Sequence, residues 1–161
     1  MSTAPTDTDR RFMRMAIDLS IKSVADGGGP FGAVIVKDGE VLSTGVNRVT
    51  ANNDPTAHAE VSAIREACRK IKHFKLEGCT IYTSCEPCPM CLSACYWAGI
   101  ERIFYGNTKQ DAESINFGDK FIYEEIIRPP FLRAIPTQML MRHEALQAFR
   151  DWENKENKVE Y

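Results

Sequence analysis

Two short segments of this sequence carry side chains of the kinds that bind zinc. The first is His58-Ala59-Glu60 and the second is Cys88-Pro89-Met90-Cys91. One imidazole and two thiolates make three zinc ligands, and a zinc ion with three protein ligands keeps a fourth position open for water. Because these ligands can serve one metal only if the two segments meet in space, this pair of segments constrains the fold more than any other feature.

Glu60 is the acidic side chain that remains once the three ligands are assigned. Zinc acidifies water so that a nucleophile forms near neutral pH, and a nearby carboxylate can take the proton. Delivered to a ring nitrogen and then to a departing amine, that proton completes a hydrolytic deamination. We therefore predict that one zinc ion per chain, held by His58, Cys88 and Cys91, deaminates an amino-substituted heterocycle with Glu60 as proton carrier. The pattern His-x-Glu followed by Pro-Cys-x-x-Cys is also the signature of zinc-dependent nucleobase deaminases.

A zinc ion that only stabilises the fold is the alternative, and it needs a fourth ligand such as Cys85. Such a protein would be a zinc-stabilised binding module without activity. Cys85, Cys88 and Cys91 are unusually spaced for a closed site, and Glu60 would have no role in it. Cys88 and Cys91 are expected on one face of a helix that opens near Pro87, and His58 at the start of another helix.

The order of the predicted elements indicates an α/β fold. Residues 33–36 and 41–46 flank Asp38-Gly39 and predict a β-hairpin. Strands are expected at residues 80–83 and 103–105, and helices from a cap at Asp9, over residues 61–71, after Cys88, and over residues 143–152. Strands separated by helices pair in parallel, so we expect a three-layer α/β/α arrangement with a mixed central sheet.

The chain length and the net charge limit the domain organisation and the kinds of partner that we expect. The 161 residues, 43% hydrophobic and 26% charged, fit one domain over 1–161 with a flexible leader over 1–8. The chain has no apolar run that could cross a membrane and no signal peptide, so no membrane partner and a cytoplasmic location are expected. The formal net charge of −2, with scattered Lys and Arg, argues against a nucleic-acid partner.

Two residues keep two interpretations each from sequence alone. Phe31 follows a glycine-rich turn over residues 26–30 and belongs either to the core or to a substrate pocket. Asn47 ends the second hairpin strand and either caps a turn or hydrogen-bonds a polar substrate.

Longer stretches around these motifs resemble the small bacterial guanine deaminases of the cytidine-deaminase fold. The resemblance is carried by residues 28–36, 53–61 and 82–91, by Tyr96-Trp97-Ala98 and Phe121-Ile122-Tyr123, and by the closing Glu160-Tyr161. It extends over most of the chain beyond residue 10. Its extent supports membership of that family more strongly than the zinc motif alone.

The resemblance implies a reaction, a substrate and a set of site residues. The reaction is hydrolysis of guanine, a small purine base, to xanthine and ammonia, with Glu60 as proton shuttle and Asp111 as a second carboxylate. The base would be bound by Asn47, His58 and Ala59, with Phe31 and Trp97 as apolar and stacking surface. The resemblance also implies a domain-swapped homodimer, in which a C-terminal segment of about residues 128–161 crosses over and Tyr161 closes the partner's site.

Other substrates stay open at this stage. A tRNA adenosine deaminase shares the zinc signature and the fold, but the chain lacks a basic excess. Guanosine and aminated triazines could undergo the same zinc-dependent reaction, and the shape of the pocket decides whether they are admitted. We expect guanine and keep these as alternatives.

Overall fold

A four-stranded mixed sheet organises the computed structural model of this chain, which describes residues 4–160. Strands β1 (Gly32–Lys37) and β2 (Glu40–Val46) form the predicted antiparallel hairpin. Asp38 and Gly39 connect them with φ angles of 50° and 79°, the left-handed pair that a tight hairpin turn requires. The hairpin prediction is confirmed.

The other two strands make the sheet mixed. Strand β3 (Cys79–Cys85) pairs antiparallel with β1 and parallel with β4 (Arg102–Asn107), in the order β2-β1-β3-β4. The parallel pair is joined through helix α4 (Pro89–Ala98), as a parallel crossover demands. Strand β3 therefore lies inside the sheet and ends directly before the cysteine motif.

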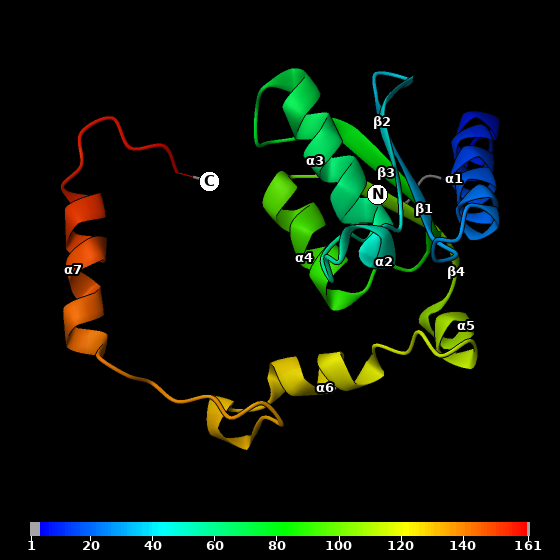
Figure 1. The fold of residues 1–161 in the computed structure, drawn as a ribbon. Helices are drawn as coiled ribbons and strands as arrows, with labels where there is room; N and C mark the ends of the chain where they lie inside the picture. Colours follow the sequence, from blue (N-terminus) through cyan, green and yellow to red (C-terminus); the bar gives the residue numbers. More distant parts are fainter. Residues whose placement is uncertain (1–3, 161) are drawn as a thin grey trace. The chain divides into compact units, whose positions relative to one another are not determined.

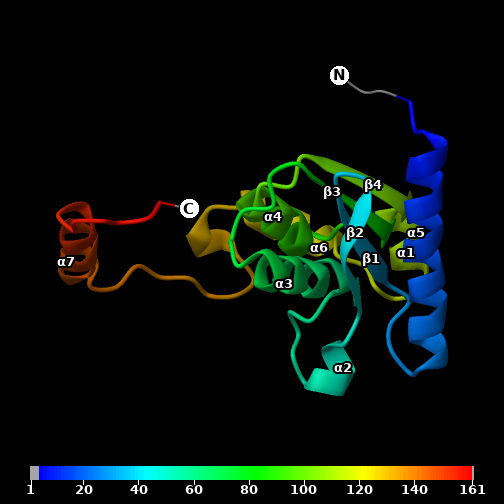
Figure 2. The same cartoon turned by 90° about the horizontal axis from the view of Figure 1, so that it is seen from above.

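Helices cover both faces of this sheet (Figures 1 and 2). Helix α1 (Asp7–Ala25) packs on one face, where Phe12 and Ala16 contact Val34 and Tyr82. Helix α3 (Ala59–Ile71) and helix α4 pack on the other face, around Ile35 and Ile81. Successive strand residues point to opposite faces, so each strand contributes to two cores. The predicted α/β/α layering is confirmed.

Gly45 allows α3 to lie close to the sheet. A Cβ atom at this position would lie 2.1 Å from the carbonyl oxygen of Ala59 and 2.7 Å from the backbone nitrogen of Ala63. Only a glycine permits this approach, because any side chain would push the helix away from β2. The first turn of α3 is thereby held against the sheet.

The start of α1 differs from the prediction. Thr6 is the N-cap, and Asp9 is the third helical residue of a capping box in which both side chains bond back to the backbone. The prediction that Asp9 caps the helix is wrong, because a capping box uses an acidic residue at that third position as readily as at the cap. The helix begins at Asp7, so it includes the last two residues of the leader expected over 1–8. A short helix that sequence did not suggest, α2 (Val49–Asn52), follows β2.

The C-terminal part forms a compact unit of its own from Lys120 onward, whereas the residues up to Asp119, including α5 (Lys109–Ser114), form the first unit. The second unit contains α6 (Lys120–Ile127), a 3-10 turn (Pro130–Leu132) and α7 (Arg142–Glu153). Helix α7 confirms the prediction over residues 143–152. The division falls before α6, eight residues earlier than the expected start near residue 128. None of the helices in the described part of the chain is long and apolar enough to span a membrane.

Candidate active site

Two helix starts bring the three predicted zinc ligands together. His58 is the N-cap of α3, and Cys88 is the N-cap of α4. Pro89 follows at the first helical position, where its fixed φ suits a helix start, and Cys91 lies two residues further into the first turn. Both ligand segments therefore begin helices on the same face of the sheet. The prediction that each motif lies at the start of a helix is confirmed.

The distances between the ligand atoms fit a tetrahedral zinc ion. Nδ1 of His58 lies 3.6 Å from Sγ of Cys88 and 3.5 Å from Sγ of Cys91. Ordinary zinc–nitrogen and zinc–sulfur bonds at a tetrahedral angle place these atoms about 3.6 Å apart. All three ligand atoms lie within 4.8 Å of one another, and within residues 4–160 the group has these three members. Three ligands leave one position for water, as a catalytic zinc requires.

Cys85 does not join this group. Its thiol points to the carbonyl oxygen of Thr108, 3.7 Å away, and burial raises the pKa of the thiol to about 11. Cys85 is not part of the group whose ligand atoms lie within 4.8 Å of one another. The closed four-ligand site of the binding-module alternative therefore has no support in this arrangement.

The two cysteine ligands share one proton when no metal is bound. The hydrogen bond between the two thiols lowers the pKa of Cys88 and raises the pKa of Cys91. The imidazole of His58 donates to the Cys88 thiolate, and this bond raises the pKa of His58. Zinc binds thiolates and a neutral imidazole, so metal binding would release these protons. The three donor atoms are therefore close together before metal binding, and the metal would displace the protons that Cys91 and His58 hold.

Glu60 lies beside these ligands in the first turn of α3. The residue is 6% exposed, and its carboxylate accepts a hydrogen bond from Oγ1 of Thr83 at 3.3 Å. Burial is the main reason why the pKa of Glu60 is raised, and the negative charge at Cys88 raises it further. A carboxylate with a raised pKa is suited to accept a proton and release it again.

Asn47 and Phe31 lie next to each other at the end of the hairpin. The backbone nitrogen of Asn47 donates to the carbonyl oxygen of Phe31 at 3.2 Å, and Asn47 Oδ1 accepts from the backbone nitrogen of Val49 at 3.3 Å. Asn47 is 8% exposed, and Phe31 packs edge-on against Phe117 with ring centroids 5.1 Å apart. Asn47 thus has the turn-capping role that sequence allowed, and Phe31 borders the core. Their contacts with a base stay predictions.

Comparisons with known proteins agree with this site. Residues 6–107 match the family described as the cytidine and deoxycytidylate deaminase zinc-binding region. The chain is 50% identical to guanine deaminase from Bacillus subtilis over 151 residues, which cover 93% of this chain and 97% of that protein. This chain belongs to the zinc-dependent cytidine and deoxycytidylate deaminase family.

The similar proteins match different shares of this chain. The crystal structure of the Bacillus subtilis guanine deaminase superposes with a TM-score of 0.92, covering 94% of this chain and 98% of that one. The tRNA-specific adenosine deaminase of Aquifex aeolicus is 43% identical over 94 residues, 58% of this chain and 62% of that enzyme. Family membership makes zinc the cofactor and identifies the chain as a hydrolase of C–N bonds. The ligand geometry described above supports the same conclusion.

Asp111, which the resemblance implied as a second carboxylate, lies in a helix cap. Asp111 is exposed, and Oδ2 of its carboxylate accepts from the backbone nitrogen and the hydroxyl of Thr108, each at 2.8 Å, in the capping box of α5. These bonds lower its pKa. A solvated carboxylate that is held in a helix cap is a weak proton donor. The catalytic role of Asp111 stays a prediction.

Asp119 is a further acidic side chain near the ligands, and sequence reasoning did not name it. It is half-buried, and desolvation followed by the negative charge at Cys88 raises its pKa. Its carboxyl group therefore lies within electrostatic range of a zinc ligand, and both effects favour its protonated form. The signal in the sequence was its position just before Phe121-Ile122-Tyr123, a run that carries the family resemblance.

The remaining predicted residues have different environments. Ala59 is fully buried at the first position of α3. Trp97 is 64% exposed within this chain and lines a shallow pocket on α4 with Ser93 and Tyr96. Tyr161 lies outside the described residues. The substrate contacts of these residues stay predictions.

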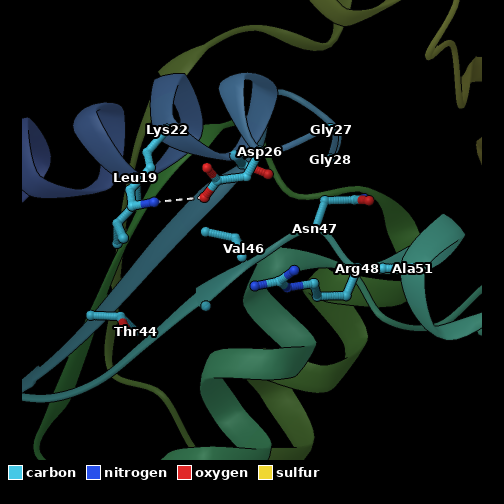
Figure 3. Close-up of a pocket in the computed structure, with 12 residues that line it drawn as sticks. Leu19, Lys22, Asp26, Gly27, Gly28, Thr44, Val46, Asn47, Arg48 and Ala51 are labelled. Atoms are coloured by element: carbon cyan, nitrogen blue, oxygen red, sulfur yellow. Dashed lines mark hydrogen bonds and ion pairs between the residues drawn. The ribbon is translucent and has the colours of Figure 1, made fainter.

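The pocket drawn in Figure 3 is separate from the metal ligands. It measures about 260 Å³ and lies between the end of α1, the end of β2 and α2. Lys22 and Asp26 form an ion pair of 2.6 Å in its wall, and Asn47 and Arg48 line it from the segment that follows β2. His58, Glu60 and the two cysteines are not among its lining residues. The chemistry therefore lies elsewhere.

Proposed function

We propose that this protein is a guanine deaminase, which hydrolyses guanine to xanthine and ammonia. The observation that carries the proposal is the extent of the likeness to the Bacillus subtilis enzyme, which covers 93% of this chain. The tRNA-specific relative from Aquifex aeolicus matches 58% of it. The likeness to the guanine deaminase thus includes the C-terminal unit, where enzymes that share a zinc centre can differ in what they admit.

The zinc centre and the buried carboxylate support this reaction. Zinc, when bound, supplies Lewis-acid chemistry that makes water nucleophilic near neutral pH. Glu60 takes a proton from that water and delivers it to a ring nitrogen of the base. Its burial next to the ligands keeps bulk water from competing for the proton. A single carboxylate thereby connects the attack of water to the protonation of the ring.

Asp119 is the carboxyl group that we favour for protonating the departing amine. Its raised pKa keeps it protonated over a wider pH range than an exposed aspartate, and the charge of Cys88 reaches it. Asp111 lacks both properties. Asn47 and Phe31 would orient the base from the end of the hairpin.

A homodimer with exchanged C-terminal units is part of the proposal. The second unit exposes large apolar side chains that a soluble monomer would rarely leave in water. Examples are Ile127, Phe131, Leu140 and Phe149, which the second unit by itself does not bury. We expect a second copy of the chain to cover them and Tyr161 to complete the partner's site.

Ammonia release from guanine, guanosine, cytidine and adenosine-containing tRNA tests the proposed substrate. We expect turnover of guanine that a zinc chelator abolishes and added zinc restores. Turnover of guanosine or tRNA in place of guanine would keep the zinc reaction and reject guanine as substrate. No ammonia from any of the four would reject the proposed function.

A further inference from the structure

Thr83 carries a buried hydroxyl group in the interior of the sheet. It lies on β3, where its neighbours in register are Ala33 on β1 and Tyr105 on β4, so its backbone is held from both sides. Its side chain is 1% exposed. Successive side chains of β3 point to opposite faces of the sheet. Tyr82 packs with residues of α1, and Ile81 packs with residues of α3. Thr83 therefore points to the face that carries α3 and the metal ligands.

The hydroxyl of Thr83 donates to one oxygen of the Glu60 carboxylate. The distance from Thr83 Oγ1 to Glu60 Oε1 is 3.3 Å. A threonine in a strand has few χ1 rotamers, because two heavy atoms branch at its Cβ. The donor is thus fixed in place by the sheet and by its own side chain.

Zinc binding leaves this hydrogen bond in place. Thr83 does not belong to the ligand group of His58, Cys88 and Cys91, so its hydroxyl keeps its proton and can donate to Glu60 when the metal is bound. The bond therefore does not depend on the protonation state of the metal ligands.

We propose that Thr83 is a positioning residue that orients the Glu60 carboxylate for proton transfer. The hydrogen bond engages Oε1 and leaves Oε2 to take and release the proton. The inference deepens the proposed function, since it rests on Glu60 being the proton carrier. It assigns to Thr83 a role in catalysis without contact with substrate or metal.

Thr83→Val is the direct test, because valine keeps the shape of the side chain and removes the donor. We expect kcat for guanine to fall on the order of tenfold, with KM nearly unchanged and one zinc retained per chain. Thr83→Ser keeps a hydroxyl and should recover most of the rate. The matched control is Thr80→Val, the same change on the same strand but on the opposite face; it should leave both kinetic constants unchanged.

Three outcomes would overturn the inference. They are an unchanged kcat in Thr83→Val, loss of zinc in that variant, and failure of Thr83→Ser to restore the rate. Thermal unfolding of every variant separates a general loss of stability from a loss of orientation. Glu60→Gln in the same experiment distinguishes the two proposals. If Glu60→Gln keeps the wild-type rate, the proposed proton carrier is wrong. If Glu60→Gln is inactive while Thr83→Val is fully active, only the role of Thr83 is refuted.

Discussion

The hydroxyl of Tyr82 donates a hydrogen bond of 2.6 Å to Oδ1 of Asp9, and this bond joins the central strand β3 to the first turn of α1. The second oxygen of Asp9 accepts from the backbone nitrogen and the hydroxyl of Thr6, each at 2.7 Å. One carboxylate thereby completes the capping box of α1 and attaches the helix to the sheet. The bonds from Thr6, followed by the bond from Tyr82, lower the pKa of Asp9 to about 2.

This relationship predicts how stability depends on pH. The folded pKa of Asp9, about 2, lies below its ordinary value of 3.8, so ionised Asp9 stabilises the fold above about pH 4. That contribution decreases as the pH falls and is lost below about pH 2. We expect urea unfolding of Asp9→Asn to show the largest stability deficit near neutral pH and a shrinking deficit toward pH 2. A deficit that stays constant over this range would contradict the prediction. Wild type and variant are compared at each pH, so loss of zinc in acid affects both.

Replacement of Glu60 by glutamine should abolish proton transfer and leave the metal in place. Glutamine has nearly the same size but cannot accept and release the proton at neutral pH, so we expect kcat to fall by at least a hundredfold. Zinc content, measured by atomic absorption, should stay at one per chain. A variant that turns over guanine at the wild-type rate would refute the proposed mechanism.

Removal of one cysteine ligand should remove both the metal and the activity. Two remaining ligands rarely hold zinc, so we expect Cys88→Ala and Cys91→Ala to be purified largely without it. Cys85→Ala is the matched control, because that thiol points to Thr108 and should leave zinc content unchanged. Zinc loss from the Cys85 variant with full occupancy of the Cys88 variant would reverse the ligand assignment.

The two candidate carboxylates can be separated by amide substitutions. We expect Asp119→Asn to lower kcat on the order of a hundredfold with zinc retained, because an amide cannot protonate the departing amine. Asp111→Asn should change kcat little and affect mainly the cap of α5. Steady-state assays of guanine deamination decide between them. A slow Asp111 variant beside a fast Asp119 variant would support the assignment made from sequence resemblance.

Deletion of Tyr161 tests the proposed exchange of C-terminal units. If its ring closes the partner's site, the shortened chain should remain a zinc-containing dimer and show a raised KM and a lowered kcat for guanine. Size-exclusion chromatography with light scattering measures the dimer, and the assay measures the kinetics. Unchanged kinetics would remove Tyr161 from the site, and a wild-type monomer would refute the exchange.

Much of the fold was predictable because its signals are short-range. Asp38-Gly39 between two β-rich runs specifies a hairpin through the backbone angles that the turn needs. The predicted ligand residues do lie at helix starts, and at α4 the reason is local, since Pro89 suits the first helical position. The start of α1 was misplaced because Asp9 suits both the cap and the third helical position equally well.

The three metal ligands could be predicted from the sequence, but the sequence did not show which of two aspartates is desolvated near them. His58, Cys88 and Cys91 are recognised by their type and spacing, because zinc accepts few kinds of donor. Asp111 and Asp119 are the same residue type eight positions apart, and no local pattern separates them. They differ in what surrounds each carboxyl group, which is a property of the folded chain.

The sequence alone determined the metal, the three residues that would hold it and the layered fold, because each depends on residue type and on spacing along the chain. The tertiary structure decided which carboxyl group is desolvated near Cys88, where the Cys85 thiol points, and that Thr83 reaches Glu60. These last properties depend on burial and on contacts between distant segments. Local sequence cannot encode them, since desolvation and hydrogen-bond geometry exist only after the sheet and its helices have packed.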